Sequence, residues 1–364
     1  MNAKVVDRLA MTSRRIESIA FAWSGLPDYA ARCIRAVIDR HPGRVKVIGT
    51  RPVVPIAGME RSLGQAVHWV DGRDANADWN RLGMRPPDLF FQGGYHRAAF
   101  NSLGLRCRSD GGKVVLQTDS NWQGTLRQHL VDPIRHRAFL RRHFDGVFVP
   151  GTSGTIYAQR MGYRSSTVFE GLYGADPTLF NGGPPLHSRP KRFLFVGRLV
   201  QVKCVVALAQ AFVHFAADRS DWSLQICGAG PLRDQLPHHP LIEVSDFLQP
   251  AQLADVFRNA RCLVLPSLSE PWGLVAHEAV LSGCALALSQ VVGAAADLAT
   301  KSNSILFRPG DVNAIADALH SIASWDTIRW QEAESMSRSV ATKFGPEPFA
   351  NAVAQFIDKL NSEM

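Results

Sequence analysis

Two cations follow a buried strand in the second half of the chain. The apolar run at residues 192–196 predicts the strand, which closes at Gly197, and an amphipathic helix is expected from Val205 onward. Arg198 and Lys203 lie in the connection between them. Free backbone amides at the start of a helix, together with two cations, favour a phosphate or diphosphate group. The segment has neither a Walker A loop nor the GxGxxG dinucleotide pattern. Taken by itself, it is therefore equally well interpreted as a solvated basic loop.

Two acids follow further along, in the stretch SEPWGLVAHEA. Glu270 lies in a loop shaped by Pro271 and Gly273, and Glu278 lies on the helix after it. Eight residues of helix rise ~12 Å, whereas the two carboxyl groups of a glycoside hydrolase stand ~5 to 9.5 Å apart. The two acids therefore suit different hydroxyl groups of one extended ligand better than one glycosidic bond. Either acid taken alone is also typical of a surface charge.

The elements that must position these residues alternate between short apolar runs and segments of helical period. This alternation predicts an α/β protein with parallel sheets. The strands are expected at residues 18–22, 45–49, 89–91, 114–117 and 146–149, then at 192–196, 223–227, 243–244, 262–265 and 285–288. A helix at 29–39 follows the first strand, and the Gly-, Pro- and Ser-rich segment 181–191 is the expected linker. The cleft between the two halves is the expected ligand site.

Composition narrows the class of protein further. Of the 364 residues, 46% are hydrophobic and 20% are charged, which excludes a disordered chain or a coiled coil. No run approaches the ~18 apolar residues of a membrane span, and the first residues lack a signal-peptide core, so we expect a cytoplasmic protein. The six cysteines stand far apart without a CxxC pair, which indicates reduced core thiols instead of a zinc site or disulfides.

Charge is unevenly distributed along the chain. Residues 1–189 carry 26 Lys and Arg against 15 Asp and Glu, a net of +11, whereas residues 190–364 carry 14 against 17. The excess predicts an anionic partner such as a phospholipid surface, a lipid pyrophosphate or nucleic acid, with plain solubility charge as the alternative. No RNP stretch or zinc finger supports nucleic acid.

One basic segment, residues 127–144, has the composition of an interfacial helix, with arginines around a few apolar residues. Its arginines are Arg127, Arg135, Arg137, Arg141 and Arg142. Because Pro133 would interrupt or start a helix, the best-formed piece is expected at residues 133–143.

Several motifs of the second half occur together in one order. They are GRL with Lys203, CGAGPLRDQL at 227–236, the two glutamates of 270–278 and NSILFRPGD at 303–311. This combination resembles the retaining glycosyltransferases of the GT-B fold, specifically glycosyltransferase family 4 (glycosyl transferases group 1), over about residues 165–325. GLYGADPTLF at 171–180 also resembles the segment that enters the second domain of these enzymes.

The resemblance implies two Rossmann-like domains facing each other across a deep cleft. Residues 1–180 would form the acceptor-binding domain, and residues 181–345 the nucleotide-sugar donor domain. The C-terminal helix, about residues 346–364, would pack back on the first domain.

The resemblance also assigns roles to individual residues. It implies that Arg198 and Lys203 neutralise the diphosphate of a nucleotide sugar, that Glu278 binds the ribose hydroxyls and that Glu270 binds the donor sugar. The other donor-site positions that it implies are Gly25 in the loop after the first strand, Gly197, Phe247 and Leu248 over the nucleobase, and the backbone amides of Trp272, Gly273 and Leu274. The family often has Gly where this chain has Asp246, which leaves the choice of base open.

The first half departs from the family at one position. Many members end a strand there with a His near the transferred sugar, whereas this chain has Thr118, Asp119 and Ser120. Asp119 could position the acceptor hydroxyl or accept its proton, and a turn or helix-cap Asp is an equal alternative. His96 could compensate from the neighbouring strand end, although a loop histidine is the commoner interpretation.

The expected activity is that of a retaining hexosyltransferase acting on a glycan or lipid-linked acceptor. The expected location is the cytoplasm, with the inner face of a membrane as the alternative. Charge on the leaving diphosphate would be stabilised by Arg198, Lys203 and helix N-termini, and the lack of a DxD triplet fits transfer without a metal. Family frequency slightly favours UDP over GDP. The alternative is a non-catalytic module that binds a nucleotide sugar or an anionic membrane, which donor turnover would distinguish.

Overall fold

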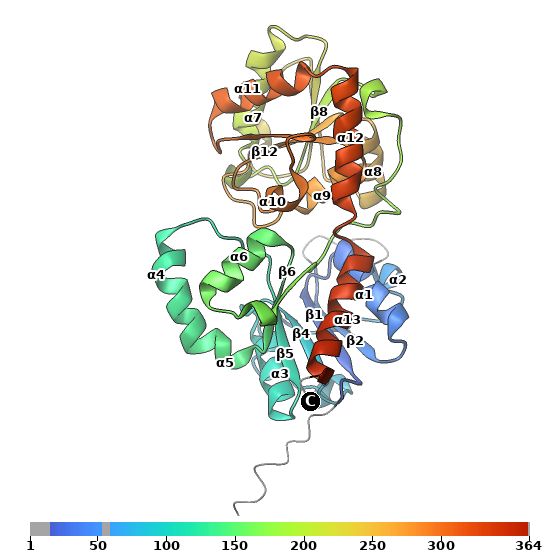
Figure 1. Ribbon diagram of the computed structural model, residues 1–364, viewed down its shortest axis with the longest axis vertical. Coiled ribbons are helices and arrows are strands. Elements are labelled where there is room, and N and C mark those ends of the chain that lie inside the picture. Colours follow the sequence, from blue (N-terminus) through green and yellow to red (C-terminus); the bar gives the residue numbers. More distant parts are fainter. Residues whose placement is uncertain (1–14, 53–58, 363–364) are drawn as a thin grey trace, which may run out of the picture.

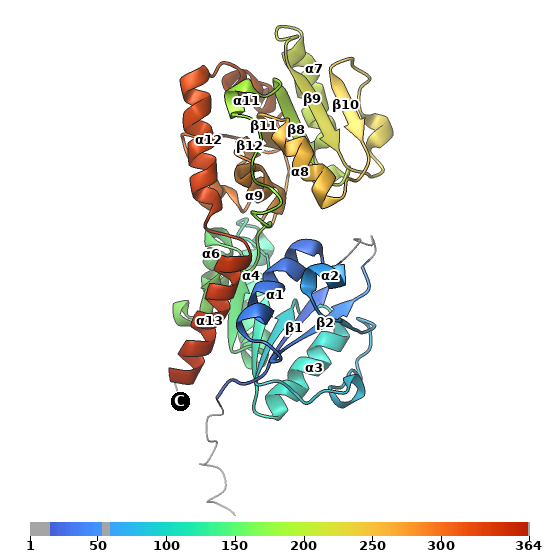
Figure 2. The ribbon, with the colours of Figure 1, turned by 90° about the vertical axis from the view of Figure 1, so that its right-hand side faces the viewer.

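The computed structural model describes residues 15–52 and 59–362, which form two α/β halves stacked along the long axis of the molecule (Figures 1 and 2). In the part described, the first half contains a seven-stranded sheet of order β3-β2-β1-β4-β5-β6-β7, and the second a six-stranded sheet of order β10-β9-β8-β11-β12-β13. Every strand pair is parallel, for example β1 with β4 and β8 with β11. The predicted α/β class with parallel sheets is therefore confirmed.

The first sheet is built from apolar runs that are buried on both faces, as parallel strands are. Its strands are β1 (Ile19–Ser24), β2 (Val45–Thr50), β3 (His68–Trp69), β4 (Leu89–Gly93), β5 (Lys113–Gln117), β6 (Gly146–Val149) and β7 (Val168–Glu170). The helices are α1 (Asp28–Arg40), α2 (Met59–Leu63), α3 (Ala98–Ser109), α4 (Leu126–Arg135), α5 (Arg141–His143) and α6 (Thr152–Met161). The strands predicted in this half all occur, and β3 and β7 are additional.

The second half repeats the arrangement. Its strands are β8 (Arg192–Val196), β9 (Ser223–Cys227), β10 (Ile242–Ser245), β11 (Cys262–Leu265), β12 (Ala285–Ser289) and β13 (Ser304–Phe307). Its helices are α7 (Val205–Ala216), α8 (Pro250–Arg258), α9 (Leu274–Leu281), α10 (Ala295–Leu298), α11 (Val312–Ala323) and α12 (Thr327–Ala341). The predicted strands again occur, and β13 is additional.

The last helix, α13 (Pro346–Ser362), returns to the first half and packs along α1 (Figure 2). Its Phe349 stacks against Phe148 of β6 with ring centroids 5.2 Å apart, and its Phe356 meets Phe169 of β7 at 4.3 Å. These aromatic contacts bury the apolar face of α13 against the first sheet. The chain therefore crosses between the halves twice.

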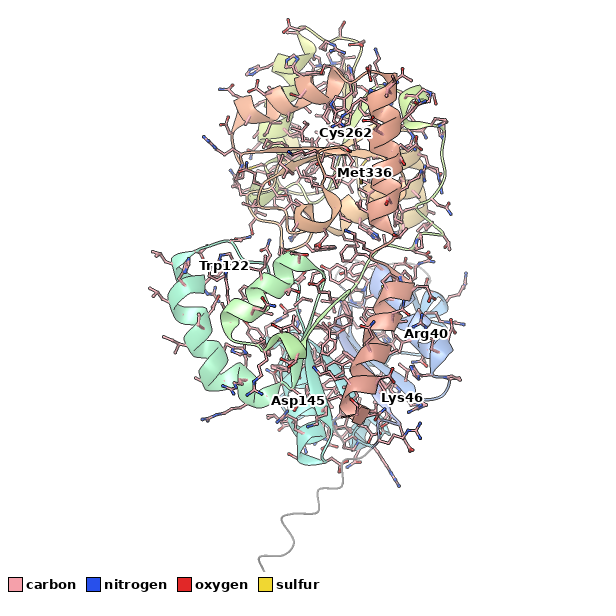
Figure 3. The ribbon with its side chains drawn as sticks, in the orientation of Figure 1. Arg40, Lys46, Trp122, Asp145, Cys262 and Met336 are labelled. Carbon is pink, nitrogen blue, oxygen red and sulfur yellow. The ribbon has the colours of Figure 1, made fainter. Side chains whose placement is uncertain are left out.

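The prediction that the basic helix begins at Pro133 is wrong. Helix α4 begins at Leu126, because Thr125 and Gln128 form a capping box that supplies partners for free backbone amides at its start. Pro133 lies inside the helix, and the next five residues, His136–Leu140, form a π-helical turn. Trp122 lies just before α4 in the chain (Figure 3). The guanidinium group of Arg160 on α6 lies over the ring of Trp122, 4.3 Å from its centroid.

No helix in the described ranges is long and apolar enough to cross a membrane.

Candidate active site

Two glycines shape the loop after β8. Gly228 and Gly230, in the CGAG segment after β9, have φ angles of +152° and +157°. A Cβ on Gly228 would lie 1.9 Å from the carbonyl oxygen of Gly197, and one on Gly230 would lie 2.4 Å from that of Leu199. Only glycine permits this approach of two backbones. The packing leaves the side chain of Arg198 exposed at the loop, with no ion pair found for it among the residues described.

Lys203 and Glu270 form an ion pair at the carboxyl edge of the second sheet. Lys203 ends a 3₁₀ turn before α7, and Glu270 lies in the loop before α9. The pair is largely buried, since the side chains are 17% and 10% exposed. Ser267 also donates its hydroxyl to Oε2 of Glu270 at 3.2 Å. The two residues predicted to contact the diphosphate and the sugar are therefore brought together.

Helix α9 begins at the same edge. Its N-cap Gly273 has φ +90°, and a Cβ there would lie 3.1 Å from Cγ of Glu270. No acceptor is found within the described chain for the backbone N–H groups of Gly273 and Leu274, so these amides can serve a bound anion. The side chain of Trp272 is 1% exposed and packs against Phe344, ring centroids 4.8 Å apart. Trp272 therefore offers the site its backbone, not its ring.

Glu278 faces a second part of the site, a cavity of about 170 Å³ between the halves. Phe247 and Leu248 line the same cavity, as the resemblance implies for a nucleobase beside its ribose. Burial, and then the neighbouring charge of Asp28 on α1, raise the pKa of Glu278 to about 8. A carboxyl group protonated near neutral pH can both donate and accept hydrogen bonds with hydroxyl groups.

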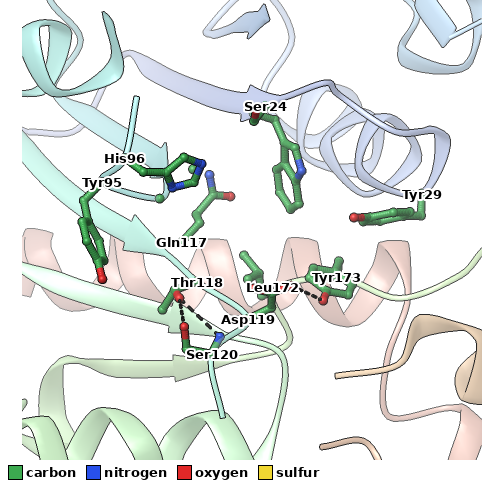
Figure 4. A pocket seen from close by; sticks show the side chains of 13 residues that line it. Ser24, Tyr29, Tyr95, His96, Gln117, Thr118, Asp119, Ser120, Leu172 and Tyr173 are labelled. Atoms are coloured by element: carbon green, nitrogen blue, oxygen red, sulfur yellow. Dashed lines mark hydrogen bonds between the residues drawn. The ribbon is translucent and has the colours of Figure 1, made fainter. Parts of the chain in front are cut away.

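A larger cavity, of about 320 Å³, opens at the carboxyl edge of the first sheet (Figure 4). Asp119 lines it from the loop after β5 and is accessible to solvent there. Desolvation by the surrounding protein raises the pKa of Asp119, the charge of Glu270 raises it further, and Tyr173 and His96 oppose the rise. The hydroxyl of Tyr173 donates to Oδ2 of Asp119 at 3.4 Å. Asp119 is thus a solvent-accessible carboxyl group with a raised pKa at this edge of the cavity.

One wall of this cavity is aromatic. The ring centroid of Tyr173 lies 5.0 Å from that of Tyr29 and 6.1 Å from that of Trp23. The cavity is also lined by polar residues, namely His96, Gln117, Thr118, Asp119 and Ser120. A cavity with both aromatic and hydrogen-bonding groups suits a molecule with a ring and several hydroxyl groups, such as a sugar. Tyr29 and Tyr173 were not predicted, because nothing in their local sequence distinguishes them from core aromatics.

Gly25 lies beside this cavity without lining it. Its φ is +73°, and its backbone N–H donates to the hydroxyl of Thr50 at 3.0 Å. That amide is therefore already used inside the first half, and the neighbouring Trp23 and Ser24 face the cavity instead.

The two edges touch through the loop that carries Asp119. Asn121 donates from Nδ2 to the carbonyl oxygen of Glu270 at 3.0 Å and to that of Val291 at 3.3 Å. Gln123 donates to the hydroxyl of Ser269 at 2.6 Å. The loops that carry Asp119 and Glu270 thus meet between the halves, and Asn121 makes a contact that the sequence did not indicate.

Solved structures show the same architecture. Anabaena HepE in complex with UDP and glucose superposes with a TM-score of 0.72 at 15% identity, covering 94% of this chain and 100% of that one. Sucrose-phosphate synthase from Thermosynechococcus elongatus superposes with a TM-score of 0.72 at 17% identity, covering 96% of this chain and 100% of that one. The chain has the GT-B fold. The expected arrangement of two Rossmann-like units across a cleft is confirmed.

A family model matches part of the second half of this GT-B chain. Residues 190–324 match the family model described as glycosyl transferases group 1. The glycogen synthase of Mycobacterium tuberculosis is 28% identical over 173 residues, 46% of this chain and 42% of that protein. An uncharacterized glycosyltransferase of Methanocaldococcus jannaschii is 30% identical over 182 residues, which are 48% of this chain and 46% of that protein. The matches span less than half the length of these curated relatives.

Proposed function

We propose that this GT-B protein is a glycosyltransferase of family 4, which transfers a sugar from a nucleoside diphosphate to a hydroxyl group of an acceptor. The observation that carries the proposal is the contact between two loops: Asn121, two residues after Asp119 of the first half, donates a hydrogen bond to the backbone carbonyl oxygen of Glu270 in the second half. Glu270 is paired there with the ammonium group of Lys203. The match to glycosyl transferases group 1 covers Lys203 and Glu270 and supports the same activity.

The donor side is assigned to the second half. Breaking the bond to a nucleoside diphosphate builds negative charge on the leaving phosphate, which cations and fixed amides stabilise more in the transition state than in the ground state. Arg198, Lys203 and the backbone amides of Gly273 and Leu274 would stabilise this negative charge near the edge where α9 begins. A metal is not required in this scheme. We favour UDP as the nucleotide, since HepE was solved with UDP and UDP-glucose.

The acceptor side is assigned to the cavity of the first half. Asp119 would orient the acceptor hydroxyl, and the aromatic wall formed by Trp23, Tyr29 and Tyr173 would pack against its ring. We propose retention of the anomeric configuration, with attack on the face that the diphosphate leaves and the departing phosphate helping to take the proton. A glycan or a lipid-linked sugar fits this polar and aromatic cavity. A module that only binds the donor is less favoured, because it would not need a titratable carboxyl group in the acceptor cavity.

The proposal is tested by thermal unfolding in the presence of UDP, GDP, ADP and dTDP. A ligand at ~100 times its dissociation constant adds about 2.7 kcal/mol to the free energy of unfolding, which shifts the midpoint measurably. UDP is expected to shift the wild type and Lys301→Ala, an exposed change in the same half, and to shift Arg198→Ala much less.

Release of UDP from UDP-sugars in the presence of candidate acceptors then separates an enzyme from a binding module. The absence of a shift with all four nucleotides would contradict the donor site. A shift without turnover of any donor would favour the binding module.

A further inference from the structure

Helix α4 exposes an apolar face that no other element of the described residues covers. Leu126 is 80% exposed, Leu130 is 64% and Ile134 is 70%, and Val131 between them is 54% exposed. At ~100° per residue these four side chains lie within about 140° of the helix surface. Phe139, in the π-helical turn that follows, is 46% exposed. Single exposed apolar residues are ordinary, whereas a contiguous group marks a contact surface.

The charge around this face has one sign. Residues 122–144 contain five arginines and a single acid, Asp132. Asp132 is 14% exposed and is paired with Arg127 at 3.4 Å, so it presents little free negative charge. Arg141 and Arg142, one turn beyond Phe139, are exposed. The apolar face is therefore bordered by cations.

The first turn of α4 is hydrogen-bonded to the loop before it. Gln128 donates from Nε2 to the carbonyl oxygen of Asn121 at 2.8 Å and accepts from the backbone N–H of Gln123 at 2.8 Å. Figure 1 shows α4 at the left margin of the first half, with α6 between it and the rest of the molecule. A helix held at its first turn, with an outward apolar face, is the arrangement of a docking helix.

We propose that α4 is a membrane-docking helix, which lies in the interface of a bilayer that contains anionic phospholipids. Aliphatic side chains of this length enter the boundary of the acyl chains, and flanking arginines bind the phosphate headgroups. Charge complementarity selects the occupant, because an apolar surface bordered by the exposed Arg127, Arg141 and Arg142 matches an anionic bilayer. An interface between two copies of the chain would bring the arginines of both copies together instead.

This docking places the candidate active site near the lipid. A small cavity beside α4 is lined both by Asp132 of the helix and by Thr118 and Ser120, which also line the cavity of Asp119. The helix and the candidate acceptor cavity thus share one edge of the first half. The proposal itself rests on α4 alone, so membrane binding is measured without donor or acceptor and stands or falls separately from sugar transfer.

The test is flotation of the full chain with vesicles of phosphatidylcholine, with and without phosphatidylglycerol. The wild type is expected to float with the anionic vesicles and to be released by high salt, because screening weakens the arginine contacts. The double variant Leu130→Ser/Ile134→Ser is expected to bind at least about tenfold more weakly, since it removes two of the inserted side chains. Ile328→Ser, which changes a residue 67% exposed on α12 of the other half, is the matched control and is expected to bind like the wild type.

Three results would overturn the proposal. They are equal flotation of the double variant and the wild type, no binding of the wild type to either kind of vesicle, and a wild-type dimer that the double variant converts to a monomer. The last result would assign the face to a second copy of the chain. Circular dichroism checks folding of the double variant, and Arg141→Ser/Arg142→Ser provides an independent variant that is expected to lose the preference for anionic vesicles while keeping all apolar residues.

Discussion

The side-chain amide of Asn121 lies 3.0 Å from the backbone carbonyl oxygen of Glu270, although 149 residues separate the two in the chain. Asn121 is 6% exposed and follows Asp119 by two positions. One hydrogen bond therefore ties the loop of the candidate acceptor residue to the loop of the candidate donor residue. A GT-B protein that closes its cleft around two substrates needs contacts of this kind, because they align groups that belong to different halves.

Asn121→Ala is expected to lower sugar transfer more than nucleotide affinity. The change leaves the carbonyl oxygens of Glu270 and Val291 without this donor and costs about 1–3 kcal/mol if both stay buried. Turnover with saturating donor and acceptor, measured beside the UDP dissociation constant, checks the split. Gln123→Ala removes an exposed contact across the same interface and serves as the control. Equal losses in affinity and turnover would show that Asn121 supports the donor site alone.

The ion pair of Lys203 with Glu270 predicts a non-additive effect on stability. Lys203→Met leaves a carboxylate that is 10% exposed without its partner and is expected to destabilise the protein by about 3–5 kcal/mol. The double variant Lys203→Met/Glu270→Gln is expected to recover part of that loss. Lys191→Met is the control, since Lys191 and Asp221 are both 45% exposed and the loss there is expected to stay below about 1 kcal/mol. Urea unfolding of the wild type, of Lys203→Met, of Glu270→Gln and of the double variant measures the coupling, and strictly additive effects of the two single changes would mean that the pair is not held in solution.

The sequence predicts most strands of both sheets because their apolar runs are buried on two faces. Strands β8, β9 and β11 match their predicted bounds, because each of these apolar runs lies between segments with a clear helical period. Strands β3, β7 and β13 were not predicted, because they have two to four residues and include exposed or polar positions. The start of α4 was also missed, although Thr125 and Gln128 carry the capping-box spacing in the sequence.

The candidate site divides in the same way. Residues in contiguous motifs of the second half, such as Lys203 and Glu270, could be proposed from their order along the chain. Contacts made across the halves could not, because no local pattern relates Asn121 to Glu270 or Tyr173 to Asp119. These contacts depend on how two separate sheets are placed, which periodicity does not encode.

Gly228→Ala is expected to disrupt the donor half. The added Cβ would lie 1.9 Å from the carbonyl oxygen of Gly197, a backbone atom that cannot move aside like a flexible side chain. We expect a loss of about 4 kcal/mol or more, or failure to fold. Gly182→Ala is the matched control, because Gly182 also has a positive φ of +76° but nothing within 4 Å of the added carbon, so only about 1–2 kcal/mol is expected. Similar unfolding midpoints for the two variants would contradict this packing.

Asp119→Asn is expected to lower turnover by about 10²- to 10⁴-fold, the range for loss of a group that handles a proton. The affinity for UDP is expected to be unchanged, since Asp119 lines the cavity of the first half. Donor turnover and nucleotide binding are measured on the same preparations, with Asp110→Asn as an exposed control on that half. Near-normal turnover of Asp119→Asn would contradict a role in proton transfer and would support the alternative that Asp119 only shapes the turn.

The raised pKa of Glu278 predicts a pH dependence of stability with a definite sign. Burial and the charge of Asp28 raise this pKa from 4.5 to about 8, so between these values the folded state holds a proton that the unfolded chain has released. Raising the pH therefore favours the unfolded chain. The contribution of Glu278 to stability is largest below about pH 4.5, is lost progressively up to about pH 8, and stays constant above that.

Comparison with Glu278→Gln isolates this contribution from all other groups that titrate. The amide keeps the size of the side chain but cannot ionise, so its unfolding midpoint lacks the decline. Both proteins are measured without nucleotide. The unfolding midpoint of the wild type is expected to fall relative to that of Glu278→Gln as the pH rises from about 5 to 8. Glu243→Gln, at an exposed position in the same half, controls for loss of one charge. A constant difference over this range would mean that Glu278 is ionised in the free protein, and that the cavity beside Phe247 holds a carboxylate for the ribose hydroxyls.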